Sequence, residues 1–164
     1  MRSPFDILGV EARFDLDQVA LEKRFRDLSR EVHPDRSRRA ELGASIDLNA
    51  AYRTLKDDLA RGRAVLEARG VPMQGEEREN DPAFLMAIME LREALGDARA
   101  ARDVAKVEAL AAQVADTYAA SCRALAASLE AHDHGAARRH LGRMRYYRRF
   151  LDEVDVIREE NELA

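Results

Sequence analysis

The stretch Glu31-Val32-His33-Pro34-Asp35-Arg36 separates two helical patterns and decides the fold of the first half of the chain. On each side of it, apolar residues recur every three or four positions, as in amphipathic helices. These residues are Leu21, Phe25, Leu28 and Val32 on one side, and Leu48, Ala51, Tyr52 and Leu55 on the other. Pro34 disfavours helical geometry at His33 and has no N–H to donate, so the first helix should end there. The sequence therefore predicts a helical hairpin with an imidazole and a carboxylate at its tip.

Taken alone, His33-Pro34-Asp35 could be an ordinary turn between helices. Its surroundings are more specific, because Phe5-Asp6-Ile7-Leu8-Gly9-Val10 precedes the hairpin and Leu-x-x-Ala-Tyr-x-x-Leu follows it at residues 48–55. Up to about Gly70, this arrangement resembles the J domain of DnaJ-type co-chaperones. The resemblance implies that the tripeptide engages a chaperone ATPase of the DnaK class.

Three basic residues of the first long helix, Lys23, Arg26 and Arg30, share one face, and Arg36 follows them. In an arbitrary helix such a stripe would be a solvated surface. Beside the tripeptide, we interpret it as an electrostatic docking face for an acidic partner, which raises the association rate more than the affinity.

Length and composition favour an all-α protein with one ordinary domain or two small ones. The 164 residues are 46% hydrophobic, 35% charged and 5% aromatic, with four Pro and eight Gly, and few β-branched runs occur. The net charge of −4 argues against a general nucleic-acid binder.

The sequence also suggests a compartment. Cys122 is the single cysteine and cannot form an internal disulfide, which suits a reducing environment. No apolar run approaches the roughly 20 residues that span a bilayer, and the N-terminus lacks the pattern of a secretory signal. We therefore expect a cytoplasmic protein without a membrane partner.

Capping signals predict the helix ends in the first half of the chain. A short helix from Pro4 should be closed by Gly9, and Asp15 or Asp17 could cap the next helix. A later helix should start at Asp57-Asp58 and end before Gly70.

After the helix that contains Tyr52, the chain resembles the HscB family, the dedicated J proteins of iron–sulfur cluster assembly. Arg61, Leu66 and Gly70 stand where that family has a similar Arg, Leu and Gly, whereas Gly62 replaces an expected Ala. Some eukaryotic relatives have a cysteine-rich N-terminal extension. This sequence shows no such extension, so we expect the bacterial type.

The domain boundary is expected in the segment before Asp81-Pro82. Residues 71–80 have no helical stripe, and Asp81 and Pro82 then provide an N-cap and a proline at the first helical position. We predict a J domain over residues 1–72, a linker over 73–81 and a C-terminal scaffold-binding domain over 82–164.

Three helices with short connections are expected in the C-terminal domain. The first should end at Gly96, the second should run from about Asp103 to His132, and the third should start near Ala136. Their core stripes are Val107, Ala111, Val114, Tyr118, Cys122, Leu125 and Leu129 in the second helix, and Leu141, Met144, Tyr147, Leu151 and Val154 in the third. The predicted fold class is all-α, with an N-terminal J domain followed by a three-helix bundle.

The helix that starts at Pro82 is apolar on two faces. Phe84, Ile88, Leu91 and Leu95 fall within one narrow arc, which should be the core face. Roughly 100–200° around the helix lie Leu85, Met86 and Met89, with Glu90, Glu93 and Asp97 on the same side. Either the helix is wrapped inside a larger core, or its second face is open for a partner within a charged rim. The small size of the domain slightly favours the open face.

The segment Phe-Leu-Met-x-x-Met-Glu-Leu-Arg-Glu at residues 84–93 closely resembles the HscB pattern that binds the IscU-type scaffold on which clusters are assembled. By position, the resemblance implies scaffold contacts at Leu85, Met86, Met89, Glu90 and Glu93, with Asp97 where the family tends to have Glu. Tyr146 aligns with an aromatic contact position of the family. Packing at the edge of the bundle is an equally good interpretation of this tyrosine.

Residues 138–149 contain six Arg and no acid, whereas residues 150–164 contain six acids and one Arg. Since no nucleic-acid motif accompanies the basic stretch, we interpret it as a solvated face, or as one that answers an acidic face of a scaffold or a neighbouring helix.

No catalytic or metal-binding pattern is evident. His132, His134 and His140 lack further ligands at a suitable spacing, and no nucleophile accompanies His33 and Asp35. We expect no metal, no cofactor and no enzymatic activity. A single thiol also indicates that the protein assists cluster chemistry without carrying a cluster.

Together, residues and resemblance predict a monomeric co-chaperone that binds an IscU-type scaffold and stimulates the ATPase of an HscA/DnaK-class chaperone, thereby promoting iron–sulfur cluster transfer. The expected ATPase-binding residues are His33, Pro34, Asp35, Lys23, Arg26, Arg30 and Arg36. Two alternatives stay open: a J-domain co-chaperone for a different client, and a helical adaptor without ATPase-stimulating activity.

Overall fold

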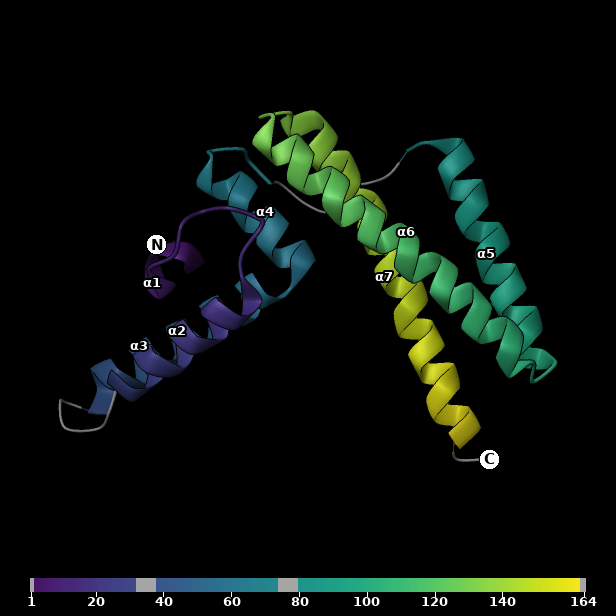
Figure 1. Cartoon of the computed structure of the whole chain (residues 1–164), viewed down its shortest axis with the longest axis horizontal. Helices are drawn as coiled ribbons and strands as arrows, with labels where there is room; N and C mark the ends of the chain where they lie inside the picture. Colours follow the sequence, from purple (N-terminus) through teal and green to yellow (C-terminus); the bar gives the residue numbers. More distant parts are fainter. Residues whose placement is uncertain (1, 32–37, 74–79, 163–164) are drawn as a thin grey trace. The chain divides into compact units, whose positions relative to one another are not determined.

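The computed structural model describes residues 2–31, 38–73 and 80–162, which form seven helices and no strand (Figure 1). The chain divides into two compact units, a first unit, Met1–Gln74, and a second unit, Gly75–Ala164. Most of the linker predicted over residues 73–81 lies outside the described residues, so its limits stay a prediction.

The first unit contains α1 (Pro4–Leu8), α2 (Gln18–Glu31), α3 (Arg38–Lys56) and α4 (Asp58–Ala68). Capping explains where these helices begin. The Asp17 carboxylate, not that of Asp15, accepts hydrogen bonds from the backbone N–H groups of Val19 and Ala20, at 2.9 and 3.1 Å. Asp57 caps α4 in the same way, as predicted.

The core of the first unit comes from the apolar faces of α1, α2, α3 and α4, with Phe14 from the loop before α2. α1 and α2 both pack against α3. The Phe25 ring of α2 stacks on the Tyr52 ring of α3, with centroids 4.2 Å apart. The buried apolar side chains in the described part of this unit are Phe5, Leu8, Phe14, Leu21, Leu48, Ala51, Leu55, Ala64, Val65 and Leu66. Burying a leucine or phenylalanine stabilises a fold by about 1.5–3 kcal/mol, so these positions account for much of the unit's stability.

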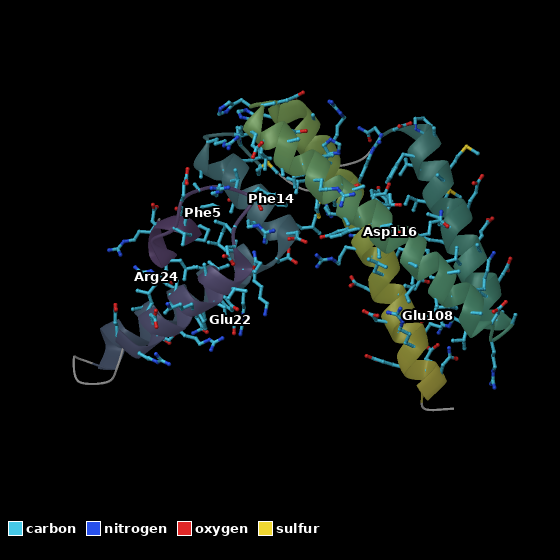
Figure 2. The ribbon with its side chains drawn as sticks, viewed as in Figure 1. Phe5, Phe14, Glu22, Arg24, Glu108 and Asp116 are labelled. Carbon is cyan, nitrogen blue, oxygen red and sulfur yellow. The ribbon has the colours of Figure 1, made fainter. Side chains whose placement is uncertain are left out.

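Gly9 ends α1 in a conformation that other residues rarely adopt. Its φ is 64°, and a Cβ atom there would lie 3.2 Å from the guanidinium of Arg24. Arg24, labelled on α2 in Figure 2, donates a hydrogen bond from Nε to the Leu8 carbonyl at 3.1 Å. Because residue 9 has no side chain, the Arg24 side chain of α2 can approach closely enough to donate to the Leu8 carbonyl at the end of α1.

The second unit contains α5 (Pro82–Ala100), α6 (Val104–Glu130) and α7 (His134–Glu162). Asp81 caps α5, as predicted, and Asp103 caps α6, which was expected to begin at about that residue. The predicted end of α5 at Gly96 is wrong, because the helix continues to Ala100. Leu95 and Ala98 are buried on either side of Gly96, and their packing outweighs the cost of about 1 kcal/mol for a glycine inside a helix.

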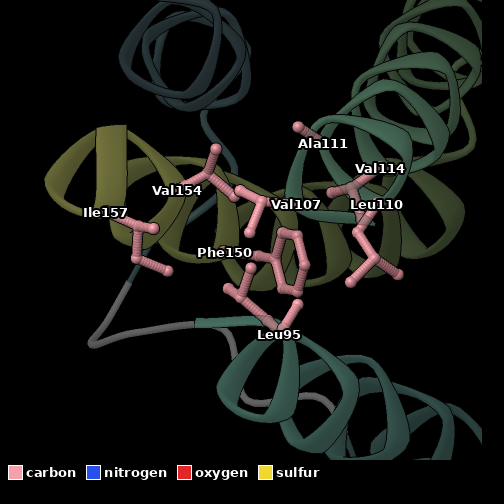
Figure 3. Packing of buried hydrophobic residues seen from close by; sticks show 9 residues of the cluster. Leu95, Val107, Leu110, Ala111, Val114, Phe150, Val154 and Ile157 are labelled. Carbon is pink, nitrogen blue, oxygen red and sulfur yellow. The ribbon is translucent and has the colours of Figure 1, made fainter. Parts of the chain in front are cut away.

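The core of this bundle forms where all three helices meet. Figure 3 shows the Phe150 ring of α7 between Leu95 of α5 and Val107 of α6. Phe150 is only 2% exposed, although the predicted stripe passed through its neighbour Leu151, which is half-buried. Tyr118, Cys122 and Tyr147, also expected in the core, are half-buried as well.

Arg158 joins α7 to α6 by a two-point ion pair. Its guanidinium donates to both carboxylate oxygens of Glu108, which is labelled in Figure 2, at 2.8 and 2.6 Å. These hydrogen bonds lower the pKa of the Glu108 carboxyl.

Within residues 2–31, 38–73 and 80–162, none of the helices combines the length and the apolar character that a membrane-spanning segment needs.

Candidate functional site

α5 has one buried face and one open face. Ile88 and Leu95 are 6% and 0% exposed, whereas Met86 and Met89 are each 63% exposed. Leu85 is half-buried between these two faces. Of the two interpretations of this helix, the wrapped one does not hold, because two large apolar side chains of a buried helix would not be open to solvent.

Acidic side chains accompany the open methionines. Glu90, Glu93 and Asp97 are exposed and make no ion pair within the described residues. The arginines of α5 are directed to α7 instead, where Arg92 pairs with Glu153 and Arg99 pairs with Glu160. The open face therefore keeps its negative charge. We call Leu85, Met86, Met89, Glu90, Glu93 and Asp97 the outer face of α5.

The charge segregation of α7 follows its contacts with α5. Arg143, in the basic half of α7, pairs with Asp81 at the start of α5 at 2.9 Å, whereas acids of the other half pair with Arg92 and Arg99. All three pairs join residues 61 or 62 positions apart, so the two helices run parallel in one register. At Arg143, the basic stretch therefore pairs with an acidic residue of a neighbouring helix, which is one of the interpretations that the sequence left open.

Tyr146 lies beside the first turn of α5. Its ring meets the Phe84 ring edge-to-face, with centroids 5.6 Å apart and an interplanar angle of 81°. Tyr147 makes a similar contact with Phe84 at 5.7 Å. The half-buried Tyr146 thus packs at the edge of the bundle and also adjoins the segment that carries Leu85 and Met86.

The basic face of α2 is exposed and partly neutralised. Arg26 pairs with Glu22 at 2.6 Å, and Arg30 lies 3.6 Å from Asp27. Lys23 is exposed without an acidic partner among the described residues. The tripeptide His33-Pro34-Asp35 and Arg36 lie outside the described residues, so their predicted role stays a prediction.

The three histidines near the turn between α6 and α7 do not converge. The rings of His132 and His134 have centroids 6.4 Å apart. Burial lowers the pKa of His140, and the positive charges of Arg143 and Arg139 lower it further. Among the described residues, no group of three His, Cys, Asp or Glu side chains could hold a metal ion.

Sequence reasoning missed one arrangement around Arg143. Its guanidinium carbon lies 4.9 Å from the centroid of the Phe84 ring, and the same guanidinium binds the cap residue Asp81. The cap and the aromatic residue were both recognisable. The arginine that joins them is one of six in its stretch, and only the tertiary structure distinguishes it.

Comparison with known proteins agrees with this two-part organisation. Residues 3–63 match the DnaJ domain, and residues 80–155 match the HSCB C-terminal oligomerisation domain. The co-chaperone protein HscB homolog of Burkholderia multivorans is 36% identical over 160 residues, covering 93% of this chain and 91% of that protein. The homolog of Bordetella petrii is 37% identical over 163 residues, covering 94% and 95%. Both relatives carry the name of a co-chaperone.

Solved structures show the same fold. Chaperone HscB from Vibrio cholerae has a TM-score of 0.83 and 32% sequence identity, with 99% of this chain and 100% of that chain covered. Human HscB has a TM-score of 0.85 at 26% identity, with 95% and 82% covered. The predicted fold class and the resemblance to the family are confirmed. With both domains matched in order and curated relatives aligned along nearly the whole length, the chain belongs to the HscB family of J-domain co-chaperones of iron–sulfur cluster assembly.

Proposed function

We propose that this chain binds an IscU-type iron–sulfur scaffold on the outer face of α5, together with Tyr146, and stimulates ATP hydrolysis by an HscA/DnaK-class chaperone of the heat-shock 70 kDa class. The J-domain surface would comprise His33, Pro34, Asp35, Lys23, Arg26, Arg30 and Arg36. The protein would act as a monomeric adaptor in the cytoplasm, without a cofactor of its own.

The observation that supports scaffold binding most directly is the exposure of Met86 and Met89. Methionine is flexible and polarisable, and it recurs at binding surfaces that adapt to a partner. Together with Glu90, Glu93 and Asp97, these side chains fit a partner that offers an apolar patch flanked by Lys or Arg. An exposed apolar patch with a polar rim is typical of a protein-binding surface.

The exposed cations of α2 support the other half of the proposal. Lys23, Arg26 and Arg30 form a positive edge that would attract an acidic surface of the ATPase. Because the two surfaces belong to different units, one molecule could hold client and ATPase together. The client would then reach the chaperone at a high effective concentration when ATP is hydrolysed.

The test is a steady-state ATPase assay of a purified HscA-type chaperone, with this protein and an IscU-type scaffold added separately and together. We expect stimulation by the protein alone and a larger than additive stimulation when scaffold is present.

Each half of the proposal has its own contrary outcome in this assay. Stimulation that scaffold leaves unchanged would contradict scaffold delivery and favour a different client. No stimulation under any condition would favour the helical adaptor that lacks activity toward an ATPase.

A further inference from the structure

Four side chains fix the first turn of α5 to the middle of α7. The Asp81 carboxylate uses one oxygen to accept from the Ala83 N–H at 3.0 Å and the other to accept from Arg143 at 2.9 Å. The Arg143 guanidinium also covers the Phe84 ring, with 4.9 Å between its central carbon and the ring centroid. We call Asp81, Phe84, Arg143 and Tyr146 the Arg143 cluster.

The cluster reaches the outer face of α5 through Phe84. The edge-to-face contact at 5.6 Å joins Phe84 to Tyr146, and Leu85 and Met86 directly follow Phe84 in the chain. A rotation or displacement of the Phe84 ring would therefore change both the first turn of α5 and the environment of Tyr146.

The cluster lies apart from the side chains that hold the bundle together. The side chains of Arg143 and Asp81 are 36% and 42% exposed, and none of the four cluster residues belongs to the buried core around Phe150. Loss of the arginine should thus loosen the first turn of α5 and leave the packing of Leu95, Val107 and Phe150 in place.

We propose that Arg143 is a positioning residue, which holds the first turn of α5 and Tyr146 in the arrangement that binds the scaffold. This inference rests on the proposed function. The physical reason is preorganisation: when the arrangement that binds is populated only a tenth of the time, the apparent affinity falls by about tenfold. Arg143 joins the cap, the aromatic ring and the neighbouring helix in one side chain, so it keeps that population high.

The experiment compares full-length wild type with Arg143→Ala, Arg143→Lys and the control Arg99→Ala. Arg99 also forms an ion pair between α5 and α7, with Glu160, but at the opposite end of α5. Calorimetry measures the Kd for a purified IscU-type scaffold, and hydrogen exchange followed by NMR measures the opening of the amides of residues 85–88.

For Arg143→Ala we expect faster exchange of these amides and a Kd that rises about five- to tenfold, because the ion pair with Asp81 and the contact with the Phe84 ring are lost. Arg143→Lys keeps the charge near Asp81 and Phe84 but lacks the planar guanidinium, so both values should fall between those of wild type and of Arg143→Ala. Arg99→Ala should leave the exchange at residues 85–88 and the Kd close to wild type.

Two results would overturn the inference while the proposed function stands. One is faster exchange in Arg143→Ala with an unchanged Kd. The other is an equal loss of affinity in Arg99→Ala, which would assign the effect to bundle stability in general. Absence of scaffold binding by the wild-type protein would overturn the proposed function and the inference with it.

Discussion

Among the described residues, Arg61 is the one buried charged side chain, at 6% exposure, and its hydrogen bonds connect three segments of the first unit. It donates to the carbonyls of Phe14 and Leu55, each at 2.8 Å, and forms an ion pair with Asp58. Its guanidinium also lies 4.7 Å from the Phe14 ring centroid. These contacts offset the cost of burying a charge, and they join the loop before α2, the end of α3 and the start of α4.

Replacing Arg61 should therefore destabilise the first unit strongly. For Arg61→Met we expect a loss of about 3 kcal/mol in the free energy of unfolding, because a buried guanidinium is removed and the carbonyls of Phe14 and Leu55 and the Asp58 carboxylate each lose a donor. A urea titration followed by amide NMR signals of the first unit measures this loss. The control Arg63→Met removes an exposed pair with Glu67 and an exposed hydrogen bond to the Met73 carbonyl, and it should cost less than about 1 kcal/mol. Similar losses in the two variants would contradict the role given to Arg61.

His140 predicts a pH dependence of the second unit. Burial and the charges of Arg143 and Arg139 lower its pKa in the folded state, against a weaker opposing effect of Asp133. As the pH falls through about 6.5, the unfolded chain binds a proton first, so stability falls, and the loss stops below the folded-state pKa. Thermal unfolding between about pH 7.5 and 5 should show a smaller decline for His140→Gln than for wild type. An unchanged decline would show that other groups cause it.

At the scale of elements, the two faces of α5 predict opposite mutational effects. Leu85→Ala combined with Met86→Ala and Met89→Ala should leave the bundle folded and weaken scaffold binding, since the methionines are exposed. Ile88→Ala, at a buried position of the same helix, should cost about 2–4 kcal/mol of stability. Circular dichroism and calorimetry on both variants measure the two effects. Unfolding of the triple variant would mean that the outer face belongs to the core.

Features with a local physical cause could be predicted from the sequence. The N-caps at Asp57 and Asp81 depend on one carboxylate and the next turn of backbone, and both occur. The glycine at position 9 was recognisable for the same reason, since it terminates a short apolar helix.

Features that depend on packing between distant segments were missed or wrong. Gly96 resembles a helix end, but Leu95 and Ala98 bury the turn around it. The sequence could not show that Phe150, and not Leu151, is the buried residue of α7, because this depends on how α7 packs against α5. At the candidate site, spacing predicted the two faces of α5. Arg143 could not be distinguished from the other five arginines of its stretch without its contacts to Asp81 and Phe84, which only the tertiary structure shows.

At the scale of the whole molecule, the assignment of ATPase and scaffold surfaces to separate units predicts that the two activities can be separated. His33→Gln should abolish ATPase stimulation and leave the Kd for the scaffold within about twofold of wild type, as expected when mutations in one unit do not couple to the other. ATPase assays and calorimetry on the same preparation measure both. An unchanged stimulated rate would contradict the assignment of the tripeptide.

The separation of faces on α5 also has a consequence for how such a protein can change over generations. The residues that hold α5 in the bundle and the residues proposed to bind the scaffold are nearly separate sets on one helix, and only the first turn serves both. Substitutions at Met86, Met89, Glu90 or Glu93 can therefore accumulate without compensating substitutions among the buried residues of the bundle. A lineage could shift its preference among related scaffolds by small surface steps, and a laboratory library at these four positions would explore the same route while nearly every member still folds.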